Sequence, residues 1–121
     1  MSSMTSYRDL EVWQKSIDFV AAIYKATENF PKNEQYGLTN QIRRASISIP
    51  SNIAEGYYRG HLPEYIRFLK IGFSSGGEVE TQLIIAKKLG FLSEKDYGEL
   101  EISLSNIMKM LNKLIQALTH R

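Results

Sequence analysis

Apolar side chains recur every three or four residues along most of this chain, which is the spacing of an amphipathic α-helix. Proline and glycine interrupt the pattern at a few places, and no useful stretch alternates between apolar and polar residues as a strand would. The interruptions leave four segments, each long enough for a helix. We therefore expect an all-α protein with four helices and no sheet.

Proline, glycine and capping residues set the bounds of these expected helices. Phe30-Pro31 ends the first, because the residue before a proline avoids helical backbone angles. Pro63 favours a helix start at Leu62, Gly90 favours a helix end, and Ser93 is a typical N-cap. The expected ranges are about 10–29, about 33–56 with an end as late as Gly60, 62–90, and from Ser93 onward.

Pro50 lies inside the second expected helix. A proline there removes one backbone N–H and crowds the carbonyl of Ser46, at a cost of about 3 kcal/mol in a regular helix. We expect a kink at Pro50 rather than a break. Nearby serine hydroxyls can bond the freed carbonyls, and we expect this of Ser46, Ser48 and Ser51.

The connections between the four segments are short, which predicts an antiparallel, up-down-up-down four-helix bundle. Apolar residues of the last helix are spaced alternately four and three residues apart, as in a heptad seam. The seam consists of Leu100, Leu104, Ile107, Leu111, Leu114 and Leu118. One such stripe is what a helix needs in order to face the core of a bundle.

The first two helices have more apolar surface than a single stripe. In the first, one set is Trp13, Ile17, Val20, Tyr24 and Thr27, and a second set is Val12, Phe19, Ile23 and Ala26. In the second, Ile47 and Ala54 lie opposite Leu38, Ile42, Ala45, Ile49 and Ile53. Because a monomeric bundle needs one apolar face per helix, the surplus predicts self-association as a ring-like homo-oligomer.

Composition limits the class of protein further. A chain of 121 residues, 43% hydrophobic and 23% charged, is typical of one domain, residues 1–121, with a polar N-terminal arm at residues 1–9. No apolar run is long enough for a membrane span or a signal peptide, so we expect a cytoplasmic protein without a membrane partner. The absence of cysteine excludes disulfides, thiolate metal sites and cysteine nucleophiles.

The sequence lacks the motifs of common catalytic and metal sites. No glutamate is followed by a histidine three residues later, as a di-iron bundle requires, and the two histidines, His61 and His120, lie in a loop and near the C-terminus. Gly72–Gly77 lacks the Gly-Lys of a phosphate loop and indicates close helix packing. We therefore expect no enzymatic activity, no metal and no cofactor.

Basic residues exceed acidic ones on the second and third helices, although the net charge of the whole chain is only +2. The candidates for phosphate contacts are Arg43, Arg44, Arg59, Arg67, Lys70, Lys87 and Lys88. Tyr57 and Tyr58 stand beside Arg59, where their rings could stack on unpaired bases. The alternative is an ordinary mixed-charge surface with aromatic residues packed at a helix end.

A series of short motifs carries a family resemblance. They are Arg8-Asp9-Leu10-Glu11-Val12-Trp13-Gln14, Phe30-Pro31, Tyr36-Gly37-Leu38, Gln41-Ile42-Arg43-Arg44-Ala45, Ser48-Ile49-Pro50-Ser51-Asn52-Ile53-Ala54-Glu55-Gly56 and Leu89-Gly90. Their order resembles the bacterial four-helix-bundle family encoded within intervening sequences of large-subunit ribosomal RNA genes. The resemblance implies a barrel-like homopentamer. The chain is also similar to the accessory variability determinant of diversity-generating retroelements, a pentameric bundle that binds nucleic acid and a reverse transcriptase.

The longest of these motifs contains Pro50, Asn52, Glu55 and Gly56, for which we expect a structural role. Asn52 and Glu55 would satisfy polar groups where the second helix ends. Alternatively, Glu55 would orient Arg43 or Arg44 of a neighbouring protomer.

Two functions of different class remain open at this point. One is a non-enzymatic, oligomeric adaptor that binds RNA or DNA through its Lys and Arg side chains. The other is a self-assembling scaffold that binds a protein partner through its extra apolar face and has no role with nucleic acid.

Overall fold

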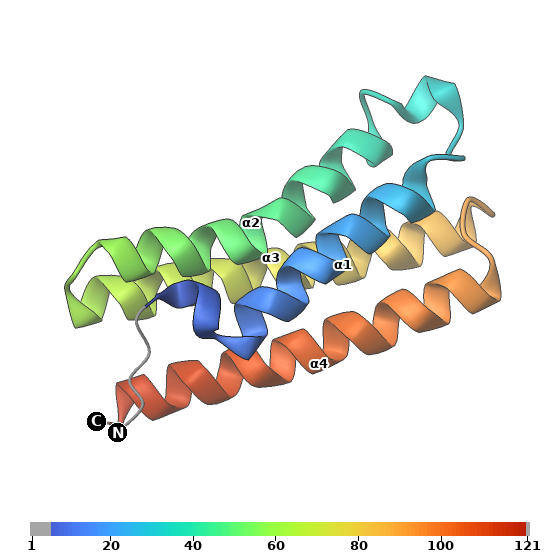
Figure 1. Cartoon of the computed structure of the whole chain (residues 1–121). Helices are drawn as coiled ribbons and strands as arrows, with labels where there is room; N and C mark the ends of the chain where they lie inside the picture. Colours follow the sequence, from blue (N-terminus) through green and yellow to red (C-terminus); the bar gives the residue numbers. More distant parts are fainter. Residues whose placement is uncertain (1–5, 121) are drawn as a thin grey trace.

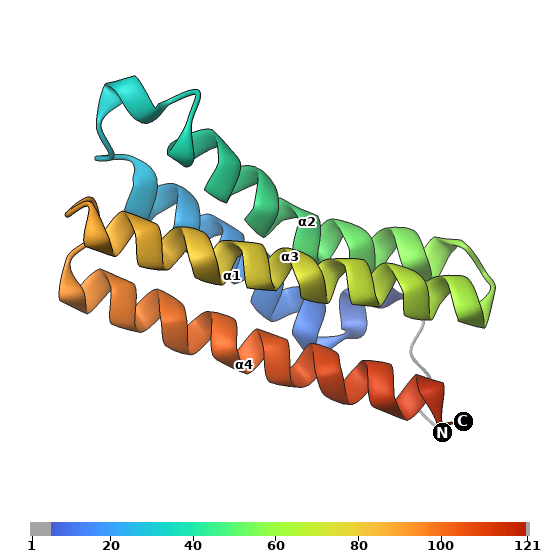
Figure 2. The same cartoon turned by 180° about the vertical axis from the view of Figure 1, so that it is seen from behind.

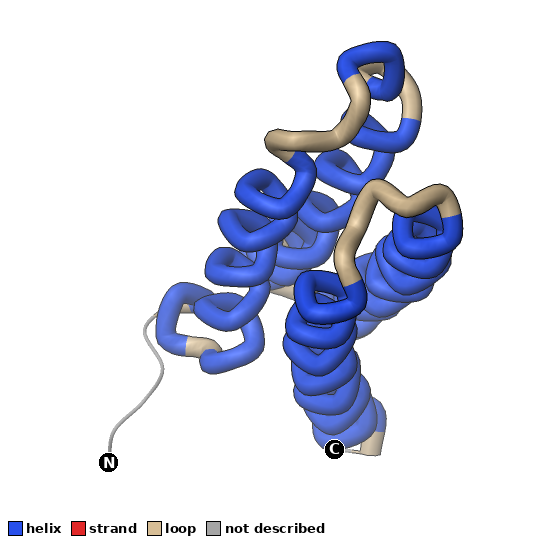
Figure 3. Tube along the Cα trace, turned by 90° about the vertical axis from the view of Figure 1, so that its right-hand side faces the viewer, coloured by secondary structure: helices blue, strands red, loops and turns tan. Residues whose placement is uncertain are grey.

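The computed structural model describes residues 6–120, and these form four α-helices and two short 3₁₀ turns without a strand. The helices are α1 (Glu11–Thr27), α2 (Leu38–Tyr58), α3 (Leu62–Lys88) and α4 (Glu94–Thr119). The turns are η1 (Tyr7–Asp9) and η2 (Lys32–Glu34). Figures 1 and 2 show the four helices packed into one bundle, and Figure 3 shows short loops joining them. The all-α, four-helix expectation is confirmed.

The bounds agree with the expected ones to within about two residues, except at the start of α2. Ser93 is the N-cap of α4, where its Oγ accepts from the backbone N–H of Asp96 at 3.0 Å. The expected start of α2 near residue 33 is wrong, because residues 32–34 form η2 and the backbone at Gly37 is not helical. The Glu34 carboxylate then accepts from the N–H of Leu38 at 3.1 Å and caps the new helix. Of the expected N-terminal arm, residues 1–5 lie outside the described part.

Helix α2 continues through Pro50 without a break, and its direction changes near the middle of the helix in Figures 1 and 2. The expected compensation by serines is wrong in its details. Ser46 donates to the carbonyl of Arg43 at 2.9 Å, and Ser48 pairs with the Ser75 hydroxyl at 2.8 Å. Neither hydroxyl bonds the Ser46 carbonyl, the acceptor that Pro50 leaves without its usual helical partner.

The core is built from one face of each helix. In α1 it uses the second apolar set, with Val12, Phe19 and Ile23 buried, while Ile17 and Tyr24 of the first set stay about two-fifths exposed. The expected apolar seam of α4 is wrong at one position, because Ile115 is buried and Leu114 is only partly buried. A straight α-helix has 3.6 residues per turn, so a strict heptad repeat drifts away from the core by the end of a long helix.

Glycines of α3 let neighbouring helices come close. A Cβ at Gly72 would lie 3.5 Å from the Ile49 carbonyl of α2, and one at Gly76 would overlap the sulfur of Met108 in α4. At the C-terminal end of α2, a Cβ at Gly56 would lie 2.8 Å from the Cβ of Phe68. Gly72 and Gly76 thus confirm helix packing for this segment of α3, whereas a Cβ at Gly77 would meet nothing within 4 Å.

Candidate nucleic-acid interface

The seven basic candidates do not form one patch. Arg43 and Arg44 lie in the first half of α2, Arg59 lies just after α2 at the turn to α3, and the other four lie on α3. Arg67 and Lys70 are near the start of α3, whereas Lys87 and Lys88 are at its end. At 1.5 Å per residue, Arg67 and Lys88 are roughly 30 Å apart along the helix. The cations are therefore spread along the length of α2 and α3.

The Arg43 side chain makes contacts between helices α1 and α2. Its Nε donates to Thr27 Oγ1 at 2.8 Å, its Nη2 donates to the carbonyl of Tyr24 at 3.3 Å, and its guanidinium lies 4.4 Å from the Tyr24 ring centroid. Thr27 in turn donates to the Ile23 carbonyl at 2.8 Å. These contacts join the C-terminal turn of α1 to α2, so a change at Arg43 disturbs the packing of the bundle as well as its charge.

Two other candidates are paired with acidic side chains. Arg67 forms a two-point ion pair with Glu64, with nitrogen–oxygen distances of 2.8 and 3.2 Å. The hydrogen bond from Arg67 is the main cause that lowers the pKa of Glu64. Lys87 contacts Glu94 at 3.2 Å and lies 4.6 Å from the ring centroid of Tyr97, which ties the end of α3 to the start of α4.

The remaining four candidates make no ion pair with any residue that the structure describes: Arg44, Arg59, Lys70 and Lys88. All four are exposed. Arg59 is nevertheless held in place, because its guanidinium lies 4.7 Å from the centroid of the buried Phe68 ring. Arg44 borders a shallow notch of about 230 Å³ that Ser48, Ser75 and Glu78 also line.

Aromatic rings gather next to Arg59, at the turn between α2 and α3. Tyr7 of η1 meets Trp13, Tyr57 and Tyr58 edge to face, with ring centroids 5.3 to 5.8 Å apart. Tyr58 is 74% exposed, whereas Tyr57 is 36% exposed. Sequence reasoning missed the part played by Tyr7, because the residue lies in a polar segment outside the helical periodicity.

In the family motif at residues 48–56, Pro50, Asn52 and Gly56 take part in helix packing, whereas Glu55 is exposed. Asn52 donates to the carbonyl and to the hydroxyl of Ser48, both at 2.8 Å, which supports the Ser48–Ser75 contact between α2 and α3. Gly56 is buried and Pro50 is buried. Glu55 departs from the structural expectation, since it is exposed and makes no hydrogen bond or ion pair in the described part of the chain.

A groove with an apolar lining lies between α1 and α2, with a volume of about 310 Å³. We call it the α1–α2 groove. It combines the surplus apolar residues of both helices with Tyr7 of η1, and it is lined by Tyr7, Trp13, Ile17, Val20, Ile47, Pro50, Ser51 and Ala54. Ile17 is 42% exposed and Ile47 38% exposed, so this surface has no partner within the described chain.

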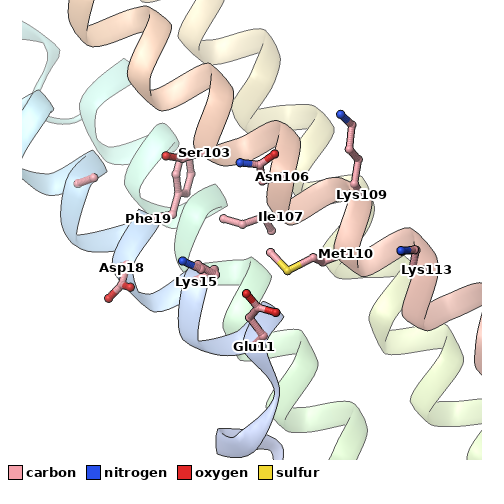
Figure 4. Close-up of a pocket in the computed structure, with 11 residues that line it drawn as sticks. Glu11, Lys15, Asp18, Phe19, Ser103, Asn106, Ile107, Lys109, Met110 and Lys113 are labelled. Carbon is pink, nitrogen blue, oxygen red and sulfur yellow. The ribbon is translucent and has the colours of Figure 1, made fainter.

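A larger groove of about 720 Å³ lies between α1 and α4. Figure 4 shows Ile107 and Met110 pointing from α4 toward α1, whereas Lys109 points away. Its rim carries two acids, Glu11 and Asp18, besides three lysines. This mixture of charges favours neither an anionic nor a cationic ligand. The described residues hold no group of three or more histidine, aspartate or glutamate side chains arranged for a metal ion.

No helix of the described chain is both long enough and apolar enough to cross a membrane.

Comparison with known proteins agrees with the motifs found in the sequence. No curated protein matches the chain. A solved structure from Bacteroides thetaiotaomicron, a protein of unknown function from the S23 ribosomal protein family, is similar with a TM-score of 0.80 and 23% identity. The similarity covers 87% of this chain and 95% of that one, and it supports the fold. The family model described as 23S rRNA-intervening sequence protein matches residues 8–113. The chain therefore belongs to the 23S rRNA-intervening sequence protein family.

Proposed function

We propose that this chain is the subunit of a ring-like homo-oligomer of antiparallel bundles that binds RNA or DNA along α2 and α3. It acts as an adaptor without catalysis of its own. The observation that carries the proposal is the set of exposed cations on α2, on α3 and at the turn between them that have no ion pair in the described chain: Arg44, Arg59, Lys70 and Lys88. Such side chains contact phosphates and make binding sensitive to salt.

The α1–α2 groove supports self-association. Its exposed isoleucines, Ile17 and Ile47, come from two helices that already bury a full core face toward the bundle. Other large apolar side chains are exposed at separate places on α3, including Ile71, Ile84 and Ile85, and any of these would be a surface unlike the groove. Two unlike complementary surfaces on one subunit generate a closed ring when the rotation between copies closes. The number five comes from the family resemblance.

Assembly into a ring would raise the affinity for nucleic acid. One subunit offers only a few unpaired cations, and each phosphate contact adds little affinity. Several copies on one strand bind together, because the first contact raises the effective concentration of the next. A modest net charge of +2 per chain is therefore compatible with tight binding by the assembly.

The binding test measures fluorescence anisotropy with duplex DNA, single-stranded DNA and structured RNA from roughly 50 to 200 mM salt. We expect affinity that falls steeply with salt and falls further in the double variant Arg44→Glu and Lys70→Glu. The double variant Lys15→Glu and Lys25→Glu, at two exposed lysines of α1, is the charge-matched control. Arg43 is left intact because it holds α1 against α2. Titrations without binding to any of the three ligands contradict the proposal.

The assembly test measures molar mass by light scattering after gel filtration. We expect several chains per particle, and dissociation when Ile17→Asp and Ile47→Asp place charges in the α1–α2 groove. Ile102→Asp on α4 is the control, since Ile102 is 61% exposed and does not line that groove. A monomeric parent protein, or an assembly that the groove variant leaves intact, contradicts the proposed surface.

A second function, a protein-binding scaffold, is favoured by the same groove. An amphipathic helix of a partner would bury Ile17, Trp13 and Ile47 in the way that another copy would. This function predicts a stable protein complex that Ile17→Asp abolishes, together with no binding of any nucleic acid.

A further inference from the structure

A small notch lies on the outer surface of α2 at its C-terminal end. Ala54, Glu55, Tyr58 and Arg59 line it, and its volume is about 390 Å³. Residues four apart on a helix are neighbours, so Ala54 lies beside Tyr58 and Glu55 beside Arg59. Glu55 and Arg59 have opposite charges at this favourable spacing, yet no ion pair joins them. Both side chains thus keep their hydrogen-bonding groups available at the notch.

Two of the four side chains around the notch, Tyr58 and Arg59, are oriented by contacts with aromatic rings. The Tyr58 ring is 74% exposed, and edge contacts with Tyr7 at 5.6 Å and Tyr57 at 5.8 Å orient it. The Arg59 guanidinium is held against Phe68. A preoriented ring and a preoriented guanidinium lose little conformational freedom when a ligand arrives, which favours binding. Ala54 adds no bulk between them.

These groups match one kind of ligand. An exposed tyrosine ring stacks on a flat base, and a guanidinium binds a phosphate oxygen. A carboxylate only accepts hydrogen bonds, and it has two oxygens to do so. Among the common bases, guanine is the one whose pairing edge carries two adjacent N–H donors, at N1 and N2. Adenine, cytosine and uracil each place an acceptor beside the donor, and that acceptor would face the carboxylate.

We infer that this notch binds an unpaired guanine. The base stacks on Tyr58, its N1–H and N2–H groups donate to the Glu55 carboxylate, and a neighbouring phosphate contacts Arg59. In a duplex the same guanine edge is occupied by cytosine, so the site selects single strands, loops and bulges. The inference rests on the proposed nucleic-acid-binding function and gives it a base preference.

The test uses the full-length protein and labelled RNA strands about nine nucleotides long, which is within the usual range for single-strand sites. One strand is all uridine, and three others carry a single central guanine, adenine or cytosine. A fifth sample places the guanine strand in a duplex. We expect the guanine strand to bind about tenfold more tightly than the other single strands, the range of a two-point contact to a base edge. Pairing the guanine removes the advantage.

Two substitutions assign the preference to named groups. Glu55→Gln replaces one acceptor with a donor, so the guanine strand falls to the affinity of the uridine strand while the uridine strand is unaffected. Glu28→Gln, the same change at an exposed acid at the end of α1, keeps the preference. Tyr58→Ala weakens every single strand severalfold and Tyr58→Phe does not. Tyr36→Ala, at a tyrosine 88% exposed in the loop before α2, has no effect.

The outcomes separate this inference from the function on which it rests. Binding that is sensitive to salt but equal for all four single strands overturns the guanine site and leaves the adaptor intact. A guanine preference that survives Glu55→Gln also overturns the site, because another group then reads the base. No binding by any of these short strands overturns the guanine site, and the adaptor is overturned as well only if duplex DNA, single-stranded DNA and structured RNA also fail to bind. Circular dichroism of each variant identifies any loss of affinity that comes from unfolding.

Discussion

At the scale of single residues, two glycines inside helices differ in what surrounds them: one allows a close contact between helices, and the other makes no such contact. Gly56 faces α3, and a methyl group there would lie 2.8 Å from the Cβ of Phe68 and 3.2 Å from the carbonyl of Tyr65. Gly77 faces open space, and a methyl group there would meet no other helix within 4 Å. The first glycine is required by helix contact, whereas the second only lowers the stability of its helix.

Alanine substitutions measure this difference. Gly56→Ala should lower the free energy of unfolding by about 1 to 3 kcal/mol, since it overpacks a contact that includes backbone. Gly77→Ala should raise it by about 1 kcal/mol, because alanine favours a helix more than glycine does. Urea unfolding followed by circular dichroism gives both values. Equal effects of the two changes would contradict the packing described for α2 and α3.

Arg43 and Arg44 form a second contrasting pair. Arg43→Ala removes two hydrogen bonds and a cation–π contact, and should lower the free energy of unfolding by about 1 to 2 kcal/mol. Arg44→Ala should change it by about 0.5 kcal/mol or less, as for most exposed positions. The sequence could not distinguish these neighbours. The partner of Arg43 is Thr27, sixteen residues earlier, and helical periodicity says nothing about such a contact.

At the scale of secondary structure, periodicity predicted the helices well and their ends less well. The start of α2 depended on Glu34, whose carboxylate caps Leu38 across the non-helical Gly37. The buried face of α1 was ambiguous, since two apolar sets compete and only the packing of the other helices selects one. In α4, the choice of Ile115 over Leu114 follows from the drift between 3.5 and 3.6 residues per turn.

The first turns of α3 contain a charge pair that responds to pH. Arg67 lowers the pKa of Glu64 below its ordinary value of 4.5. A carboxylate whose pKa is lowered in the folded state contributes stability above its unfolded pKa, and this contribution is lost as pH falls through the folded value. Arg67→Gln should therefore raise the pKa of Glu64, as measured by nuclear magnetic resonance titration. An unchanged pKa would show that the pair does not persist in solution.

The same pair limits nucleic-acid binding if the adaptor proposal is correct. Glu64→Gln keeps the shape of the side chain but removes the charge that occupies Arg67. We expect tighter binding of nucleic acid and a slope of affinity against salt that is steeper by about one counterion per subunit. Glu80→Gln, an exposed acid elsewhere on α3, is the matched comparison. A slope for Glu64→Gln that is no steeper than that of the parent protein would mean that Arg67 does not contact phosphate.

At the scale of the whole molecule, the two proposed properties are coupled. If several subunits contact one strand, separating them should reduce affinity even where no basic residue has changed. The variant Ile17→Asp with Ile47→Asp should therefore bind long RNA much more weakly than the parent, by a factor of about 10² or more. Binding to a strand short enough for one subunit should change little. Anisotropy with strands of increasing length makes the measurement.

The sequence predicted an all-α fold with four helices because it contains four strongly periodic segments. It also predicted that α1 and α2 carry surplus apolar surface, and the structure places Ile17 and Ile47 in one groove. The candidate interface was harder to predict from the sequence, since the charge of a residue does not show whether its side chain has a partner within the folded chain. Of seven candidates, Arg43, Arg67 and Lys87 have partners that depend on how the helices meet or on which rotamers they adopt.

The tight turn between α2 and α3 has a consequence for how the chain reaches its folded state. Only Arg59, Gly60 and His61 separate the two helices, and Gly60 adopts a φ of +65° that suits a sharp reversal. Contacts next to this turn, such as that of Arg59 with Phe68, therefore join residues close in the chain. Proteins rich in such local contacts fold within microseconds to milliseconds, because little loop entropy is lost before contacts form. The helical hairpin that carries the basic side chains should thus form early, before subunits meet.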